Sequence, residues 1–203
     1  MRRRLAASAL ALALLAGIAT GLSACSDAND DLVDQYEQGD GQGFISGDGR
    51  VQEIAIADRG DPVEFTGTAV DGSTITSDDF ENTVLVLNFW YAGCGPCRAE
   101  AELLESTFET YADEGVQFLG VNIYDGPEQA TAFEEKYGIT YPSLLAADDA
   151  DLKLAFASWT PLQSVPITLV LDTQGRVAAR FIGAVQDDTS LPTIVGDVLA
   201  EDS

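Results

Sequence analysis

The stretch VLVLNFWYAGCGPCRAE, residues 84–100, places two cysteines close together at the end of an apolar run. The run at 84–90 is continuous rather than alternating, which is typical of a central strand covered on both faces. A helical pattern follows it, so Cys94 is expected at a helix N-terminus and Cys97 one turn into that helix. Such a pair closes a structural bridge, binds a metal or exchanges electrons with other proteins.

Strand and helix patterns alternate along the chain from about Val51 onward. A hairpin is expected at 63–76, with Asp71-Gly72 at its turn. The further strands are expected at 84–90, 116–123, 141–145, 167–171 and 177–181, and the helices from the cysteines to Gly115 and at 127–138, 151–157 and 190–200. This order predicts an α/β fold with a mixed central sheet flanked by helices.

The beginning of the chain has the pattern of a secretory signal. Three arginines at 2–4 precede an apolar stretch at 5–22, and small residues follow it. The ending Leu-Ser-Ala-Cys, at 22–25, resembles the lipobox of bacterial lipoproteins, which implies cleavage after residue 24 and a lipid on Cys25. The alternative is an uncleaved membrane anchor, because 18 largely apolar residues nearly span a bilayer. Both interpretations place the protein outside the cytoplasm at the cell membrane.

Three regions follow from this division. Residues 1–24 are expected to be the signal peptide, and residues 25–49 a flexible acidic tether that lacks periodicity. Residues 50–203 are expected to form the folded domain.

The composition of the chain excludes several classes of function. The chain carries 10 basic and 34 acidic residues, a net charge of −24, and without residues 1–24 the net charge is −27. Such a charge repels phosphate backbones, so nucleic acid is not an expected partner. The chain contains no histidine, which excludes Ser-His and Cys-His triads and histidine metal sites. With Cys25 lipidated, two thiols remain, too few for a four-cysteine zinc site. No metal or other cofactor is expected.

Thiol-disulfide exchange is the chemistry that suits Cys94 and Cys97. The unpaired N–H groups and the positive dipole end at a helix N-terminus stabilise a thiolate, and a thiolate is the species that attacks disulfides. Pro96 suits the first helical turn because it has no N–H group to leave unpaired there. Cys94 is therefore predicted to attack and Cys97, further inside, to resolve, with Gly95 and Pro96 between them facing the substrate.

At this point the sequence resembles the thioredoxin superfamily, and within it the TlpA/ResA-like family of membrane-tethered thiol-disulfide oxidoreductases. The similar stretches are LNFWYAGCGPCRAE, YGITYP at 137–142 and VPITLVLDTQGRVAARFIGAV at 165–185. Together they cover roughly residues 50–200. The resemblance implies a thioredoxin-like fold with an N-terminal β-hairpin and a helix-strand insertion at 127–145, both of which the TlpA/ResA-like group adds.

The resemblance also implies a second part of the site. In the family, a proline before the later strand has a cis peptide bond, faces the cysteines and shapes the groove that receives a partner's polypeptide. Here it falls on Val165-Pro166. The alternative is a proline tolerated at the first residue of a strand. Trp90 is a further candidate for the substrate surface, although ordinary core packing explains it equally well.

One departure from the family concerns the proton of the resolving thiol. Thioredoxins carry a buried aspartate six residues before the first cysteine, and here that position is Asn88, which does not titrate. Glu100 lies three residues after Cys97, on the same helix face, and a glutamate there tunes the cysteines in the ResA-like group. We expect Glu100 to carry the proton. The alternative is a solvated helix glutamate like Glu102 and Glu105.

The function implied is thiol-disulfide exchange with protein substrates. The Gly-Pro dipeptide between the cysteines favours a reductant, served by a membrane thiol electron donor, with apocytochrome c as the family-implied substrate. The alternatives are an oxidant of secreted proteins and a lipid-anchored binding module with a permanent bridge. A bridge across so short a loop contributes little stability, which favours exchange. A peroxiredoxin would need a Pro-x-x-x-Thr-x-x-Cys setting, which Cys94 lacks.

Overall fold

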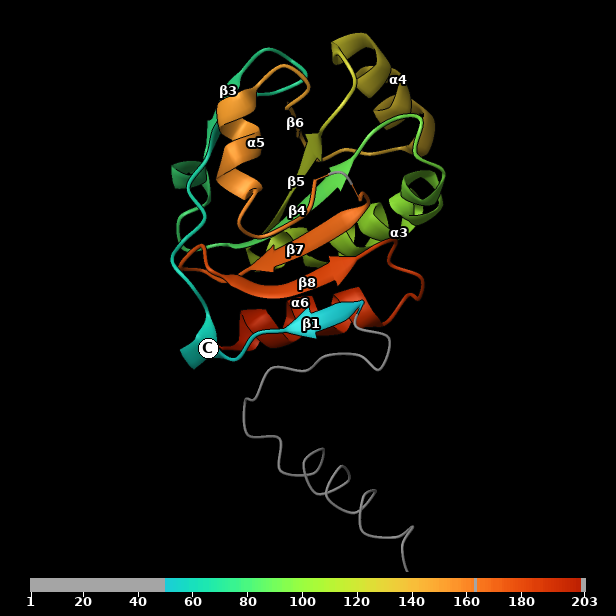
Figure 1. Cartoon of the computed structure of the whole chain (residues 1–203). Coiled ribbons are helices and arrows are strands. Elements are labelled where there is room, and N and C mark those ends of the chain that lie inside the picture. Colours follow the sequence, from blue (N-terminus) through green and yellow to red (C-terminus); the bar gives the residue numbers. More distant parts are fainter. Residues whose placement is uncertain (1–49, 163, 202–203) are drawn as a thin grey trace, which may run out of the picture. The chain divides into compact units, whose positions relative to one another are not determined.

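The computed structural model describes residues 50–162 and 164–201 (Figure 1). The expectations for the signal peptide at 1–24, the lipid on Cys25 and the tether at 25–49 therefore lie outside the described residues. Within the described part of the chain, none of the helices has the length and apolar character needed to cross a bilayer.

A mixed six-stranded sheet forms the centre of the domain, with the strand order β1-β8-β7-β4-β5-β6. Its strands are β1 Val51–Glu53, β4 Val84–Trp90, β5 Val116–Asn122, β6 Ser143–Leu145, β7 Ile167–Leu171 and β8 Val177–Ile182. Strand β5 runs parallel to both β4 and β6, whereas β7 is antiparallel to β4 and to β8. The expected mixed α/β sheet is confirmed.

Strand β4 lies inside the sheet, as its uninterrupted apolar sequence predicts, and all seven of its residues are buried. Alternate side chains enter opposite layers. Leu85, Leu87 and Phe89 join the core on one face of the sheet, and Val84 and Val86 join the core on the other.

Helices cover both faces of the sheet. They are α3 Gly95–Tyr111, α4 Pro127–Tyr137, α5 Ala150–Phe156 and α6 Ser190–Ala200, and three short 3-10 helices are η1 Ile56–Asp58, η2 Ser77–Phe80 and η3 Ala112–Glu114. Helix α5 packs on the Leu87 face through Leu152 and Phe156. Helices α3 and α6 pack on the opposite face (Figure 1). The elements expected from the sequence are present, with bounds that agree within a few residues.

A small hairpin lies beside one edge of the sheet. Strands β2 Thr66–Thr68 and β3 Thr74–Thr76 pair in antiparallel fashion, and the predicted Gly72 turns the chain with φ 85°. Ala69 forms an isolated antiparallel bridge with Leu144 of β6. The N–H of Val70 donates to the carbonyl of Ser143 at 2.9 Å. The hairpin thus covers strand β6, which is the end strand of the sheet.

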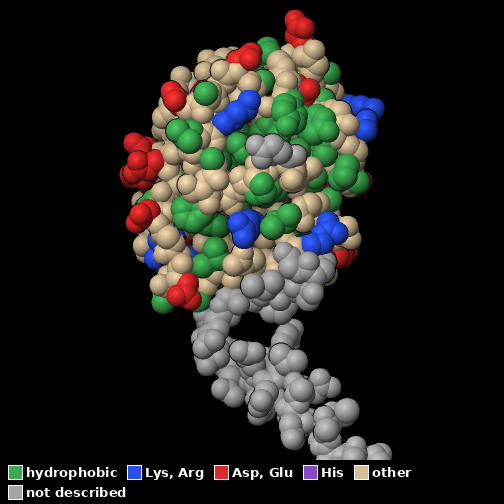
Figure 2. Space-filling view, viewed as in Figure 1, with side chains coloured by type: hydrophobic (Ala, Val, Ile, Leu, Met, Phe, Trp, Pro, Cys, Tyr) green, Lys and Arg blue, Asp and Glu red, His purple; other side chains and the backbone are tan. Residues whose placement is uncertain are grey.

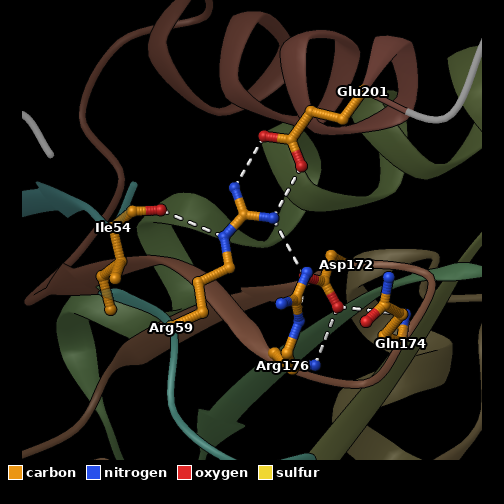
Figure 3. Close-up of polar contacts among 6 residues, drawn as sticks. All are labelled: Ile54, Arg59, Asp172, Gln174, Arg176 and Glu201. Atoms are coloured by element: carbon orange, nitrogen blue, oxygen red, sulfur yellow. Dashed lines mark hydrogen bonds and ion pairs between the residues drawn. The ribbon is translucent and has the colours of Figure 1, made fainter. Parts of the chain in front are cut away.

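A buried arginine joins three parts of the domain (Figure 3). The guanidinium of Arg59 contacts Asp172, in the turn between β7 and β8, at 2.9 Å, and Glu201, at the end of α6, at 2.6 Å. Its Nε donates to the carbonyl of Ile54 at 3.0 Å. The side chains of Arg59 and Asp172 are each 3% exposed. Arg59 therefore joins the segment after β1 to the β7–β8 turn and to the end of α6.

Candidate active site

The two cysteines lie where strand β4 turns into helix α3. Cys94 is the N-cap of α3, and its Sγ accepts a hydrogen bond from the N–H of Cys97 at 3.1 Å. Pro96 lies in the first turn, as its missing N–H predicts. Cys94 and Cys97 form a disulfide across a Cα–Cα distance of 5.3 Å. The sulfur of Cys94 thus receives a helix N-terminal hydrogen bond, the environment expected to stabilise a thiolate.

Accessibility alone does not separate the two sulfurs in this disulfide form. Cys94 is 3% exposed and Cys97 is 2% exposed, whereas Gly93, Gly95 and Pro96 beside them are exposed. The helix position therefore distinguishes the cysteines. Cys94 occupies the cap, and Cys97 lies within the helix, packed with Ala101 and Phe133.

The loop before Cys94 is anchored by an aspartate that the sequence analysis missed. The N–H of Ala92 donates to Oδ2 of Asp125 at 2.5 Å, and Nδ2 of Asn122 donates to the same oxygen at 2.9 Å. Asn122 ends β5 and is fully buried. Because β4 and β5 are parallel, their carboxyl ends meet at one edge of the sheet, which brings the two following loops together. The signal available in the sequence was a polar residue at the end of the apolar strand, Asn122, with Asp125 three residues after it.

The Val165–Pro166 peptide bond is cis, as the family resemblance implied. Val165 packs against the cluster that contains Trp90, Cys94 and Cys97. Pro166 is buried, and its carbonyl accepts the N–H of Gly183 at 2.9 Å. The segment that leads into β7 therefore borders the disulfide, although it lies far from it in the sequence.

Trp90 lies behind the disulfide rather than on the surface. It is 4% exposed, and its ring packs against Phe133 of α4 with centroids 4.3 Å apart. It also lines a small internal cavity together with Cys97, Asn88 and Tyr141. This burial favours core packing over contact with a partner, the two uses that the sequence left open for Trp90.

Glu100 is a buried carboxyl group at the base of the site. It is 1% exposed, its Oε1 accepts from Nδ2 of Asn88 at 3.0 Å, and its Oε2 accepts from the N–H of Val185 at 2.8 Å. Asn88 also donates to Oγ1 of Thr168 at 3.1 Å. Burial raises the pKa of Glu100 from 4.5 to about 7, against the lowering effect of the bonds from Val185 and Asn88. A carboxyl group with this pKa exchanges protons near neutral pH.

The expectation that Glu105 is a solvated helix glutamate is wrong. Glu102 is exposed as expected, but Glu105 is 8% exposed and accepts hydrogen bonds from the N–H and hydroxyl of Thr140. Helix α3 therefore turns two glutamates inward, and each accepts hydrogen bonds there: Glu105 from Thr140, and Glu100 from Asn88 and Val185. Glu100, with its carboxyl group buried, is not the solvated glutamate of the alternative interpretation.

The fold and the site together define a class of protein. A cystine caps the helix that follows a central strand, and a cis-proline segment packs beside it. This is the arrangement of a thioredoxin-like thiol-disulfide oxidoreductase.

Comparison with known proteins identifies the family. The model of the AhpC/TSA family matches residues 60–193, so the chain belongs to that family. The thiol-disulfide oxidoreductase ResA of Geobacillus kaustophilus is 27% identical over 134 residues, which is 66% of this chain and 74% of the relative. The protein is thus a thiol-disulfide oxidoreductase of the ResA type.

Solved structures agree with this assignment. A secreted thiol-disulfide isomerase from Corynebacterium glutamicum is 30% identical, with a TM-score of 0.66, over 77% of this chain and 96% of that one. A DsbF homologue from Corynebacterium diphtheriae is 28% identical, with a TM-score of 0.65, over 76% and 96%.

Proposed function

We propose that the protein is an extracytoplasmic reductant of protein disulfides, held at the cell membrane by a lipid on Cys25. A membrane thiol donor restores its dithiol after each cycle. Apocytochrome c, kept reduced for haem attachment, is the substrate that the family resemblance implies. The described secretion of the C. glutamicum relative supports the location. Replacing Cys25 with Ser tests the anchor, since the variant should leave the membrane fraction.

The observation that carries the proposal is the position of Cys94 at the N-cap of α3. The thiolate of Cys94 attacks a sulfur of the partner's disulfide, forming a mixed disulfide and releasing the partner's other sulfur as a thiolate. The thiolate of Cys97 then attacks Sγ of Cys94, which releases the second partner sulfur and forms the Cys94–Cys97 disulfide. Two electrons pass to the partner, which leaves as a dithiol.

Glu100 supplies the proton transfer in this scheme. Cys97 must lose its proton before it attacks, and Glu100 lies three residues further along the same buried helix face. Its raised pKa, about 7, allows it to accept that proton near neutral pH. Asn88, which donates to Glu100 and does not titrate, orients the carboxyl group. If Glu100→Gln left the cysteine titration and the exchange rate unchanged, this role would be excluded.

The reduction potential of the Cys94–Cys97 pair tests the direction of electron flow. The Gly95-Pro96 dipeptide supports a value near about −270 mV, the value of thioredoxin. The measurement is equilibration with a thiol buffer, followed by alkylation and mass determination. A Cys94→Ser, Cys97→Ser variant supplies the baseline. A potential near about −120 mV would instead identify an oxidant that forms disulfides in secreted proteins.

A further inference from the structure

A groove of about 470 Å³ opens beside the redox site. Its walls come from the segment that follows β5, from α5 and from the segment after α5. The lining residues are Ile123, Tyr124, Ala150, Lys153, Leu154, Ala157, Thr160, Pro161 and Leu162. The volume lies within the range of about 300–1,000 Å³ in which proteins bind ligands.

Two large apolar side chains of the groove wall are exposed to solvent instead of being packed in the core. Leu154 is 71% exposed and Tyr124 is 56% exposed, and among the described residues only Ile56 joins them as a large exposed apolar side chain. Figure 2 shows apolar side chains gathered on this face, while most acidic side chains in view lie near its edge. In a chain of net charge −24, an apolar face indicates a surface that contacts a partner.

Residues of the groove wall lie next to segments that border the redox site. The ring of Tyr124 packs edge-on against Tyr91, with centroids 5.2 Å apart, and Tyr91 lies three residues before Cys94. On the other side, Pro161 and Leu162 lead towards the cis bond at Val165–Pro166. A polypeptide joined to Cys94 therefore has the groove within reach of its next residues.

Two polar side chains also belong to the wall of the groove. Nζ of Lys153 donates to the carbonyl of Ala147 at 2.6 Å, which fixes the lysine stem as part of the wall. Thr160 is 4% exposed, and its hydroxyl has no hydrogen-bond partner within the described part of the chain.

We propose that this groove docks an extended segment of the protein substrate, which places a large apolar side chain against Tyr124 and Leu154 while its cysteine is joined to Cys94. The acidic surroundings select against segments that carry Asp or Glu beside that side chain. The inference rests on the proposed exchange with protein substrates and adds the rule by which a substrate is chosen.

Short peptides that carry one cysteine as a mixed disulfide with a coloured aromatic thiol test the docking. The reduced protein attacks the disulfide, the coloured thiol leaves, and its absorbance gives the rate. Matched peptides carry Phe or Ser at each position flanking the cysteine. We expect the wild type to prefer Phe about tenfold at one or more positions, which corresponds to about 1.4 kcal/mol. Leu154→Asp and Leu154→Ser should remove the preference while leaving the rates with the Ser peptides unchanged.

The matched control is Ile56→Asp, because Ile56 is similarly exposed at 53% but lies outside the groove. This variant should keep the preference for Phe. If the wild type reacts equally with Phe and Ser peptides, the groove is not a docking site, although disulfide exchange stands. If the wild type reacts with none of the disulfides, the exchange function itself fails. A dimer that Leu154→Asp dissociates, with the peptide preference intact, would assign the groove to a second copy of the chain.

Discussion

At the residue scale, two residues, Asn88 and Glu100, stand in this protein where thioredoxins have one buried aspartate. Asn88 keeps the position in the central strand, and Glu100 brings the carboxyl group from the helix to it, 3.0 Å from Nδ2 of Asn88. The second oxygen accepts from the N–H of Val185, so each oxygen of the carboxyl group has a donor, and the residue is only 1% exposed to solvent. Burial has a larger effect on the pKa of Glu100 than these two hydrogen bonds have, so the carboxyl group takes up a proton near neutral pH.

Glu100→Gln is expected to change how stability depends on pH. The folded-state pKa of about 7 lies above the ordinary value of 4.5, so protonated Glu100 favours the folded state. The stabilisation is complete below about pH 4.5 and is lost as pH rises through 7. Relative to Glu100→Gln, the disulfide form should lose about 3 kcal/mol of unfolding free energy across this range. Urea unfolding at several pH values measures it.

Two further variants test whether the pH dependence and the exchange activity come from the carboxyl group of Glu100. Glu102→Gln, an exposed neighbour on α3, should leave the pH dependence as in the wild type. Glu100→Gln leaves one donor facing an amide group, and adding Asn88→Asp restores an acceptor there together with a titratable group. The double variant should regain exchange activity if the site needs a proton carrier. Equal pH profiles for the wild type and Glu100→Gln would contradict the interpretation.

The sequence placed the candidate site residues that a local pattern or the family resemblance marks. Cys94 and Cys97 were assigned from the strand-to-helix transition, and Pro166 from the resemblance. The burial of Glu100 was not predictable from the helix pattern, because it depends on Val185, which lies 85 residues away in the sequence. Asp125 was missed for the same reason, since its partner Ala92 lies on another loop.

At the scale of elements, the loop between β4 and α3 is held in place by hydrogen bonds to the loop that follows β5. Asp125 accepts from Ala92 and from Asn122, and Oδ1 of Asn122 accepts from the N–H groups of Tyr124 and Asp125. The two loops form one hydrogen-bonded unit. The position of Cys94 thus depends on β5 as well as on its own strand.

Asp125→Ala should loosen this unit. The change leaves the N–H of Ala92 and the amide of Asn122 without an acceptor, which costs about 1–3 kcal/mol for a buried donor. We expect faster hydrogen exchange at the N–H of Ala92 and a slower reaction of Cys94 with disulfides. Asp113→Ala, at an exposed aspartate in η3, is the control and should alter neither. Unchanged exchange at Ala92 would contradict the anchoring role.

Most elements were predicted, because their sequence patterns are strong, but one short strand was missed. Strand β4 matched at both ends, and α4 ended at Gly138 because that residue adopts φ 70°. Strand β1 was not assigned, since its three half-buried residues carry no alternation. Its pairing with β8 comes from contacts more than a hundred residues apart in the sequence. The order of the strands likewise depends on such contacts.

At the scale of the whole molecule, Arg59 connects the segment after β1, the β7–β8 turn and the end of α6. Hydrogen bonds from Arg176 and Arg59 outweigh the burial of Asp172, so that the pKa of this carboxyl group is lowered. Glu201 receives two hydrogen bonds from the same guanidinium. The chain segments at either end of the described domain are thereby joined through one side chain.

Arg59→Met should destabilise the domain by about 3 kcal/mol, at the low end for a broken buried ion pair because Arg176 still contacts Asp172. The lowered pKa of Asp172 gives stability that is present above about pH 3.8 and is lost as pH falls through the folded-state value. The difference between the variant and the wild type should therefore shrink in acid. Thermal unfolding measures it, with Arg98→Met, at an exposed arginine, as the control. A constant difference in acid would exclude the ionic contribution.

The hairpin at the border of the sheet has a consequence for how substrates are recruited. Many proteins capture an unfolded chain by letting it lie alongside an open border strand, through main-chain bonds that ignore its side chains. On the β6 side, Ala69 and Val70 already occupy that place. A substrate chain therefore cannot add a strand to the sheet beside β6, so at this edge main-chain pairing does not contribute to holding a substrate.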